Sequence, residues 1–101
     1  MRLIQINLQP AFGGGEVYTA FLARGLAELG VATTLFHHPR AGFWPRLRLP
    51  AGTEFLAAAD WDEMAARLPR ERTWLLSHGP LPTALAARLA PQHLLSGIAH
   101  M

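Results

Sequence analysis

The chain begins with MRLIQINLQPAFGGGEVYTAFLARGLAELG (residues 1–30), in which an apolar run, a glycine triplet and a helical pattern follow one another. Residues 2–8 are expected to form a strand with apolar side chains on both of its faces, as a strand covered on both sides requires. Apolar residues recur at helical spacing from Glu16 to Leu29, and Gly30 supplies a stop. A strand, a glycine turn and a helix form half of a βαβ unit. The helix N-terminus is therefore expected at the carboxyl end of the strand, where its free N–H groups form a candidate anion site.

The rest of the chain repeats this alternation. We expect strands at 31–36, 53–57, 73–77 and 93–98, and helices at 60–68 and 83–90. Asp60, with Glu63 three residues later, is typical of a helix cap. Alternating strands and helices with right-handed crossovers predict one α/β domain over residues 1–101, a Rossmann-like open parallel sheet of order 3-2-1-4-5 with helices on both faces. Gly25 inside the first helix costs about 1 kcal/mol relative to alanine, so we expect it to permit close packing on the sheet.

The segment 39–52 breaks the pattern with three prolines and three arginines, and repeated proline excludes a helix or a central strand. We interpret it as a loop. Two interpretations of its function stay open. Phe43, Trp44, Arg46 and Arg48 could contact anionic lipid at the inner face of a membrane, or the aromatic side chains could fold back onto the domain.

Composition narrows the class of protein. Half of the 101 residues are hydrophobic, which allows a packed core, and the net charge of +2 gives no reason to expect a nucleic-acid partner. With no cysteine, the chain can form neither disulfides nor a thiolate metal site. No apolar run approaches the ~18 residues of a membrane span, and the start lacks a signal-peptide pattern. We therefore expect a cytoplasmic protein.

Polar residues follow the ends of several expected strands. Ligands of open α/β sheets bind at the carboxyl ends of the strands, beside the point where the strand order reverses. The residues expected at this edge are Gly13, Gly14, Gly15, Glu16, His37, His38, His78, Gly79 and His100. Their convergence predicts a functional cleft, in which a neutral imidazole could orient a sugar hydroxyl or move a proton.

Each member of this set also has a simpler interpretation. The glycine triplet could be only a flexible turn, His37 and His38 could be solvated loop residues, and His78 could bond its neighbouring turn. His100 could stand near the strand by chance, whereas His93 begins a strand instead of following one. No two histidines have a local spacing such as H-x₃-H, so a zinc site is not favoured and we expect no metal.

Several familiar sites are excluded. The chain has no lysine, so it has no phosphate-binding P-loop, and it has no G-x-S-x-G hydrolase elbow. Tyr18 stands where a dinucleotide fingerprint needs its third glycine, and His37-His38 replace the acidic residue expected after the second strand. A receiver domain is excluded because it needs an acidic cluster and a lysine.

Three segments together resemble a known family. GGGEVYTAFLARGLAELG (13–30) is similar to the GGxE…LAxxLxxxGHxV opening of retaining, family-four glycosyltransferases of the GT-B fold. LSHGP (76–80) resembles the H-x-H-[GE] strand end of that family, although Leu76 replaces the first histidine. SGIAH (96–100) resembles its T-x-H segment, and the order and spacing of the three match.

The resemblance implies an incomplete N-terminal, acceptor-side domain, with the donor-binding domain absent. Such enzymes transfer a sugar from a nucleotide-sugar to a glycan or lipid-linked glycan, with no cofactor and no required metal. By resemblance His100 is the catalytic candidate near the reacting sugar, and Gly13, Gly14, Gly15, Glu16, His78 and Gly79 bind substrate. We expect no transfer by these 101 residues alone, and self-association through an apolar edge at the fifth strand. The alternative is a non-catalytic, flavodoxin-like module that binds a nucleotide or a sugar.

Overall fold

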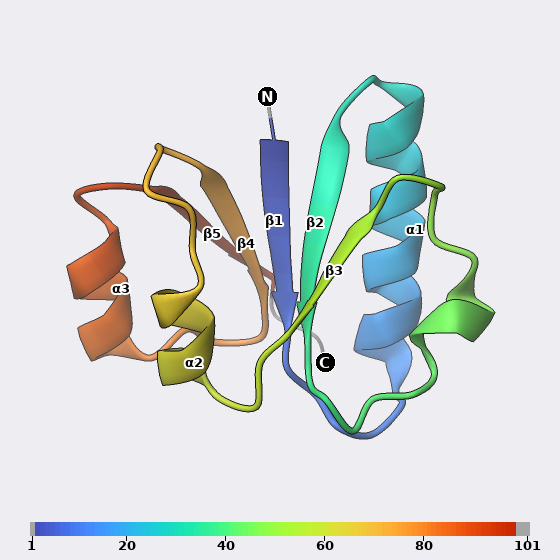
Figure 1. Ribbon diagram of the computed structural model, residues 1–101, viewed down its shortest axis with the longest axis horizontal. Coiled ribbons are helices and arrows are strands. Elements are labelled where there is room, and N and C mark those ends of the chain that lie inside the picture. Colours follow the sequence, from blue (N-terminus) through green and yellow to red (C-terminus); the bar gives the residue numbers. More distant parts are fainter. Residues whose placement is uncertain (1, 99–101) are drawn as a thin grey trace.

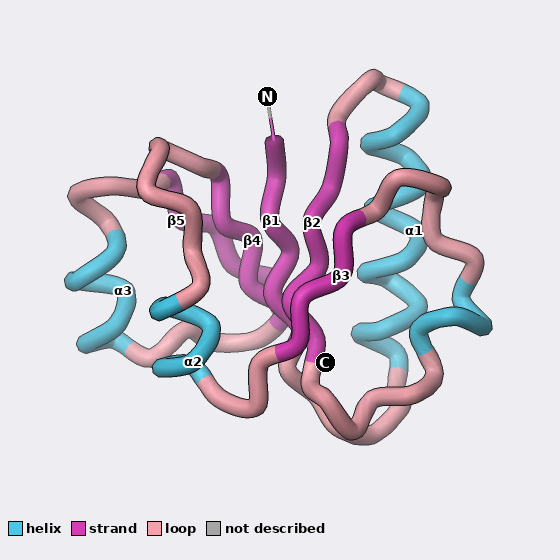
Figure 2. The backbone as a smooth tube through the Cα atoms, viewed as in Figure 1, coloured by secondary structure: helices cyan, strands magenta, loops and turns pink. Residues whose placement is uncertain are grey.

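A computed structural model describes residues 2–98 and shows an α/β fold in which one parallel sheet separates two layers of helices (Figure 1). In chain order the elements are β1 (Arg2–Asn7), α1 (Gly14–Glu28), β2 (Ala32–His37), the 3₁₀ helix η1 (Trp44–Leu47), β3 (Glu54–Ala57), α2 (Trp61–Ala66), β4 (Trp74–His78), α3 (Thr83–Leu89) and β5 (Leu94–Ile98). The five strands pair in parallel in the order β3-β2-β1-β4-β5, which confirms the predicted topology. Figure 2 shows α2 and α3 together on one side of the sheet and α1 with η1 on the other.

The face under α2 and α3 is apolar. Alternate residues of the strands point toward these helices, because successive side chains of a strand face opposite sides of the sheet. Ile4, Ile6, Phe36 and Leu75 pack here with residues of the two helices, among them the fully buried Met64. This cluster is the main hydrophobic core of the described residues.

The face under α1 has two different parts. Over β2, Leu35 packs with Ala41 and Trp44. Trp44 is 2% exposed, so the interpretation in which it folds back onto the domain is confirmed for this side chain. Phe43 is half-buried with its ring centroid 5.2 Å from that of Trp44, while Arg46 and Arg48 are exposed.

Over β1 the same face is polar. Gln5 and Asn7 are buried beneath Glu16 and Thr19 of α1, although the other buried residues of β1 are apolar. Buried polar side chains need hydrogen-bond partners, so this part of the face has to be internally paired. It forms the floor of the candidate site described below.

Two details of α1 correct the sequence interpretation. The helix begins at Gly14 instead of Glu16, with Gly13 as its extended N-cap residue. Gly25 lies on the exposed side, and a Cβ built on it would have no atom within 4 Å. The prediction that Gly25 permits close packing on the sheet is therefore wrong, because α1 contacts the sheet through Thr19, Ala20 and Ala23.

The other local signals hold. Gly30 has a φ of +79°, a left-handed conformation that suits a residue just past a helix end. Asp60 caps α2 by accepting a hydrogen bond from the Glu63 backbone N–H at 2.8 Å. The carboxylate of Glu63 reaches back to the N–H of Ala59, which completes a variant of the expected capping box. None of the helices among residues 2–98 is both long enough and apolar enough to cross a membrane.

Candidate functional site

A pocket of about 520 Å³ opens at the carboxyl edge of β1 and β4. It is lined by Asn7, Gln9, Ala11, Phe12, Gly13, Gly15, Glu16, His78, Gly79 and Pro80. The topology explains this meeting, since β1 and β4 are neighbours at the point where the strand order reverses. Five of the predicted site residues are therefore brought together: Gly13, Gly15, Glu16, His78 and Gly79.

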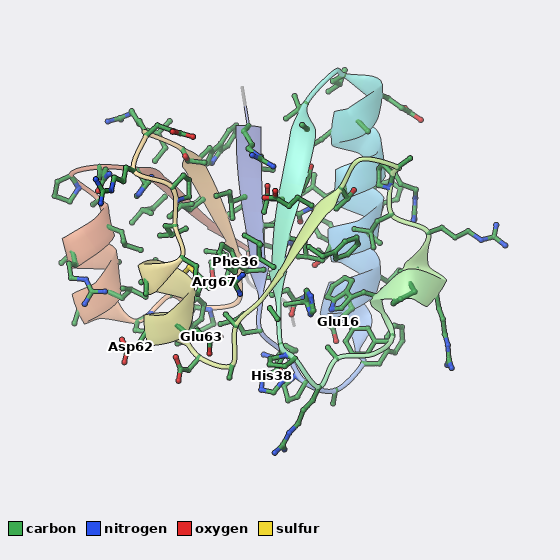
Figure 3. All side chains as sticks on the ribbon, in the orientation of Figure 1. Glu16, Phe36, His38, Asp62, Glu63 and Arg67 are labelled. Carbon is green, nitrogen blue, oxygen red and sulfur yellow. The ribbon has the colours of Figure 1, made fainter. Side chains whose placement is uncertain are left out.

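The other predicted residues that the structure describes are not among the lining residues of this pocket. Gly14 is in the first turn of α1 but is not among the lining residues. His100 lies outside the described residues. His37 and His38 make local contacts in the turn after β2, with the ring Nδ1 of His38 accepting from the Arg40 N–H at 3.0 Å. Figure 3 shows His38 on this turn, below the sheet.

His93 is a structural residue. It is buried at the opposite edge of the sheet, where its Nδ1 accepts a hydrogen bond from the Thr73 backbone N–H at 3.2 Å. Residues 2–98 contain no group of three metal-ligating side chains.

Glu16 is the charged centre of the pocket. Glu16 is only 3% exposed, and its carboxylate accepts a hydrogen bond from the Asn7 Nδ2 at 3.3 Å. Figure 3 shows the side chain at the start of α1, where the positive end of the helix dipole favours a negative charge. The position at which we expected an external anion is thus close to a carboxylate that the chain supplies itself.

Hydrogen bonds hold Asn7 in one orientation. Its Oδ1 accepts from the Gln9 backbone N–H at 3.2 Å, so its Nδ2 must face Glu16 and Thr19. The Thr19 hydroxyl accepts from Asn7 at 3.1 Å and donates to the Gly15 carbonyl at 2.7 Å. These bonds tie the first turn of α1 to the end of β1 and fix the floor of the pocket.

His78 is held by the neighbouring strand. Its Nε2 lies 2.6 Å from the Gln5 Oε1. The Gln5 amide nitrogen donates to the Thr19 carbonyl at 3.3 Å, which fixes the orientation of the amide, because a carbonyl oxygen can only accept. His78 therefore carries a hydrogen on Nε2 and donates it to Gln5. The ring also packs edge-on to Tyr18, with centroids 6.2 Å apart.

Gly79 gives the pocket its edge beside β4. Its φ of +102° is a conformation that side chains rarely adopt, and its N–H donates to the Ile98 carbonyl at 2.9 Å. The Ser77 hydroxyl donates to the Gly79 carbonyl at 2.8 Å. Glycine is thus needed at this turn for the backbone to leave β4 alongside the pocket.

The glycine triplet has a different role from the one that its composition suggests. Gly13 has a φ of −161°, extended backbone that any residue adopts, and Gly14 and Gly15 are helical. A Cβ on Gly13 would stand 3.6 Å from the Glu16 Oε1, an ordinary contact distance. The missing side chains therefore do not serve a special turn. At Gly13 the absence of a side chain leaves room beside the Glu16 carboxylate.

Gln5 and Asn7 hold pocket residues in place, and sequence reasoning missed both of them. The signal was present, because two amides stand two residues apart among the apolar residues of the strand, and this spacing places both on one face. Among the described residues that line the pocket there is no arginine, and the chain has no lysine. The pocket therefore suits a neutral ligand with hydrogen-bond donors better than a phosphate.

Comparisons of the chain with protein-family models, with curated proteins and with solved structures find no match. The fold and site define an α/β protein with a pocket at the strand-order reversal, where polar and apolar side chains meet.

Proposed function

We propose that this chain is the acceptor-side domain of a glycosyltransferase that moves a sugar from a nucleotide-sugar to a glycan or lipid-linked glycan acceptor, and that its pocket binds acceptor hydroxyl groups. The observation that carries this proposal is the buried Glu16 carboxylate in the lining of a pocket that His78 also lines. The motif resemblance at residues 13–30 and 76–80 supports the same class of enzyme.

A sugar fits the chemistry of this pocket. Its hydroxyls can donate to the Glu16 carboxylate, and hydrogen bonds to an ionised acceptor are about twice as strong as neutral ones. The carboxylate is already oriented by Asn7 and by the helix N-terminus, so little order has to be created when a ligand binds. The apolar side chain of Phe12, exposed at the rim, offers a surface for a sugar ring.

A nucleotide fits less well. A diphosphate would approach a carboxylate with no lysine or arginine among the described lining residues, and like charges at such a distance repel. In this proposal the nucleotide part of the donor is bound by a separate domain. The role of His100 as the histidine near the reacting sugar stays a prediction from the resemblance alone.

Titration of the ¹⁵N-labelled chain with a methyl glycoside, a short oligosaccharide and uridine diphosphate tests this proposal by NMR. We expect the amide signals of Gly13, Gly15 and Gly79 to move with a carbohydrate at millimolar concentration, and to stay unchanged with uridine diphosphate. Glu16→Gln removes the charge and should weaken sugar binding about tenfold, equivalent to ~1.4 kcal/mol.

Glu28→Gln is the matched control, because Glu28 is an exposed carboxylate on the same helix, outside the pocket. It should leave binding unchanged. Movement of the three glycine signals with uridine diphosphate but with neither carbohydrate would contradict the proposal and favour a non-catalytic nucleotide-binding module.

A further inference from the structure

The outer side of α1 carries two unusually exposed apolar side chains. Leu29 is 79% exposed and Phe21 is 67% exposed, more than any other large hydrophobic residue among residues 2–98. Both stand four residues from Gly25, one on each side. Residues four apart form a ridge on a helix surface. Leu29 is the C-cap residue directly after α1, so Phe21, Gly25 and Leu29 form a row along the helix to its end, with a gap in the middle.

Nothing described in the chain uses this gap. Gly25 is exposed, and a Cβ on it would meet no atom within 4 Å. Glycine inside a helix costs about 1 kcal/mol relative to alanine. A glycine between two exposed apolar residues is typical of a place where another backbone approaches closely.

The apolar surface continues from α1 onto the sheet. A groove of about 270 Å³ runs between the helix and the outer strands, lined by Leu3, Tyr18, Leu22, Leu26, Val31, Trp74, Leu76 and Ile98. Figure 2 shows α2 and α3 on the opposite side of the sheet and α1 beside β2. The groove lies on the α1 side, with residues of β4 and β5 in its lining. The ridge and the groove together form one apolar face.

We propose that a second copy of this chain packs on the apolar face, with α1 antiparallel to α1 of the partner across a two-fold axis at Gly25. In such a pair, a residue that comes a given number of positions before Gly25 in one subunit meets the residue that comes the same number of positions after Gly25 in the partner. Phe21 then meets the partner's Leu29, and Leu29 meets the partner's Phe21. The two glycines cross at the axis, where their missing side chains let the helices approach closer than the usual 8–10 Å.

The spacing favours a second copy over an unrelated helix. A two-fold interface uses the same patch on both subunits, so the patch must be complementary to itself. Phe21 and Leu29 satisfy this condition because both are apolar and both stand at the same distance from Gly25.

The area of the face is also sufficient. The exposed parts of Phe21, Tyr18 and Trp74 amount to roughly 300 Å², at about 200 Å² for a whole aromatic side chain. Val17 and Leu29 extend the patch. A standard interface buries about 800 Å² on each partner, of which about 60% is apolar, so three side chains already supply more than half of the apolar part.

Sedimentation of single and mixed variants tests this arrangement. The unmodified chain should dimerise, while Phe21→Glu and Leu29→Arg alone should each raise the dimer dissociation constant at least 100-fold, because each places a charge against an apolar side chain. An equimolar mixture should dimerise again. In the mixed dimer one contact pairs the new carboxylate with the new guanidinium, and the other keeps the original Phe21 and Leu29.

Phe55→Glu is the matched control, since Phe55 is an exposed aromatic residue on the edge strand β3, away from α1. It should not change the dimer. A chain that stays monomeric at millimolar concentration, or a dimer that survives both α1 variants, would overturn the proposal.

A pair of cysteines gives an independent geometric test in a chain that has none. The double variant Phe21→Cys, Leu29→Cys should form a covalent dimer under oxidation, and the single variants should not. The two positions lie about 12 Å apart along one helix, too far for a disulfide within a chain. Equal crosslinking of a single variant would contradict the antiparallel pairing.

Discussion

Replacing Trp44 by alanine is expected to destabilise the protein strongly, because this side chain anchors the loop between β2 and β3. Trp44 is 2% exposed and packs with Leu35 and Ala41. Truncation of a buried tryptophan to alanine costs about 3–5 kcal/mol. The indole N–H has no hydrogen-bond partner within residues 2–98, and removing an unpaired buried donor relieves part of that cost.

We therefore expect a loss near the lower limit, about 3 kcal/mol, which lowers the melting temperature of a domain this size by roughly 12–24 °C. Thermal and urea unfolding followed by circular dichroism measure it. Trp44→Phe is the control, because it keeps an aromatic ring, removes the unpaired N–H and should change stability by less than about 1 kcal/mol.

The opposite result would refute the reasoning. If Trp44→Ala lowered the melting temperature by less than about 4 °C, the side chain would not be part of a packed cluster. The membrane interpretation of Trp44 would then regain its basis. The side chains left for such a contact in the described structure are Phe43, which is half-buried, and the exposed Arg46 and Arg48.

Two further changes test local features of the helices. Gly25→Ala, measured in solution dilute enough to keep the chain monomeric, should stabilise α1 by about 1 kcal/mol and raise the melting temperature by roughly 4–8 °C, because the new methyl group meets no atom. A lower melting temperature would show that a side chain is not tolerated there. Asp60→Ala should cost about 1 kcal/mol through loss of the α2 cap, measured by urea unfolding, whereas Asp60→Asn should retain most of the stability. Equal loss in both variants would exclude capping as the cause.

The two proposals use different ends and sides of α1. The pocket lies at the N-terminus of the helix, with Glu16 facing the sheet edge. The apolar face lies along the helix around Gly25, so a dimer of this kind leaves the pocket accessible. Sugar binding and dimerisation can therefore be measured separately, and the failure of one does not decide the other.

Local sequence determined the elements and their order. The strands are short and mostly apolar, and their alternation with helices leaves few topologies, since crossovers between parallel strands are right-handed. The cap at Asp60 and the stop at Gly30 depend only on residues within one turn, which is why both could be predicted. Glu16 and His78 line one pocket because β1, which leads into α1, and β4 are neighbouring parallel strands whose carboxyl ends lie at the same edge of the sheet.

Only the tertiary structure decided which face of each element, and which loop residues, are buried. The sequence shows that Gly25 lies in a helix, but not which face of that helix the sheet covers. Trp44 follows three residues that are all compatible with a surface loop, and only packing against Leu35 from another element makes it part of a core. The state of His78 likewise depends on Gln5, 73 positions earlier, which holds its Nε2 at 2.6 Å. Contacts between residues so far apart are set by how the strands pair and the layers pack, and no local pattern of residues encodes them.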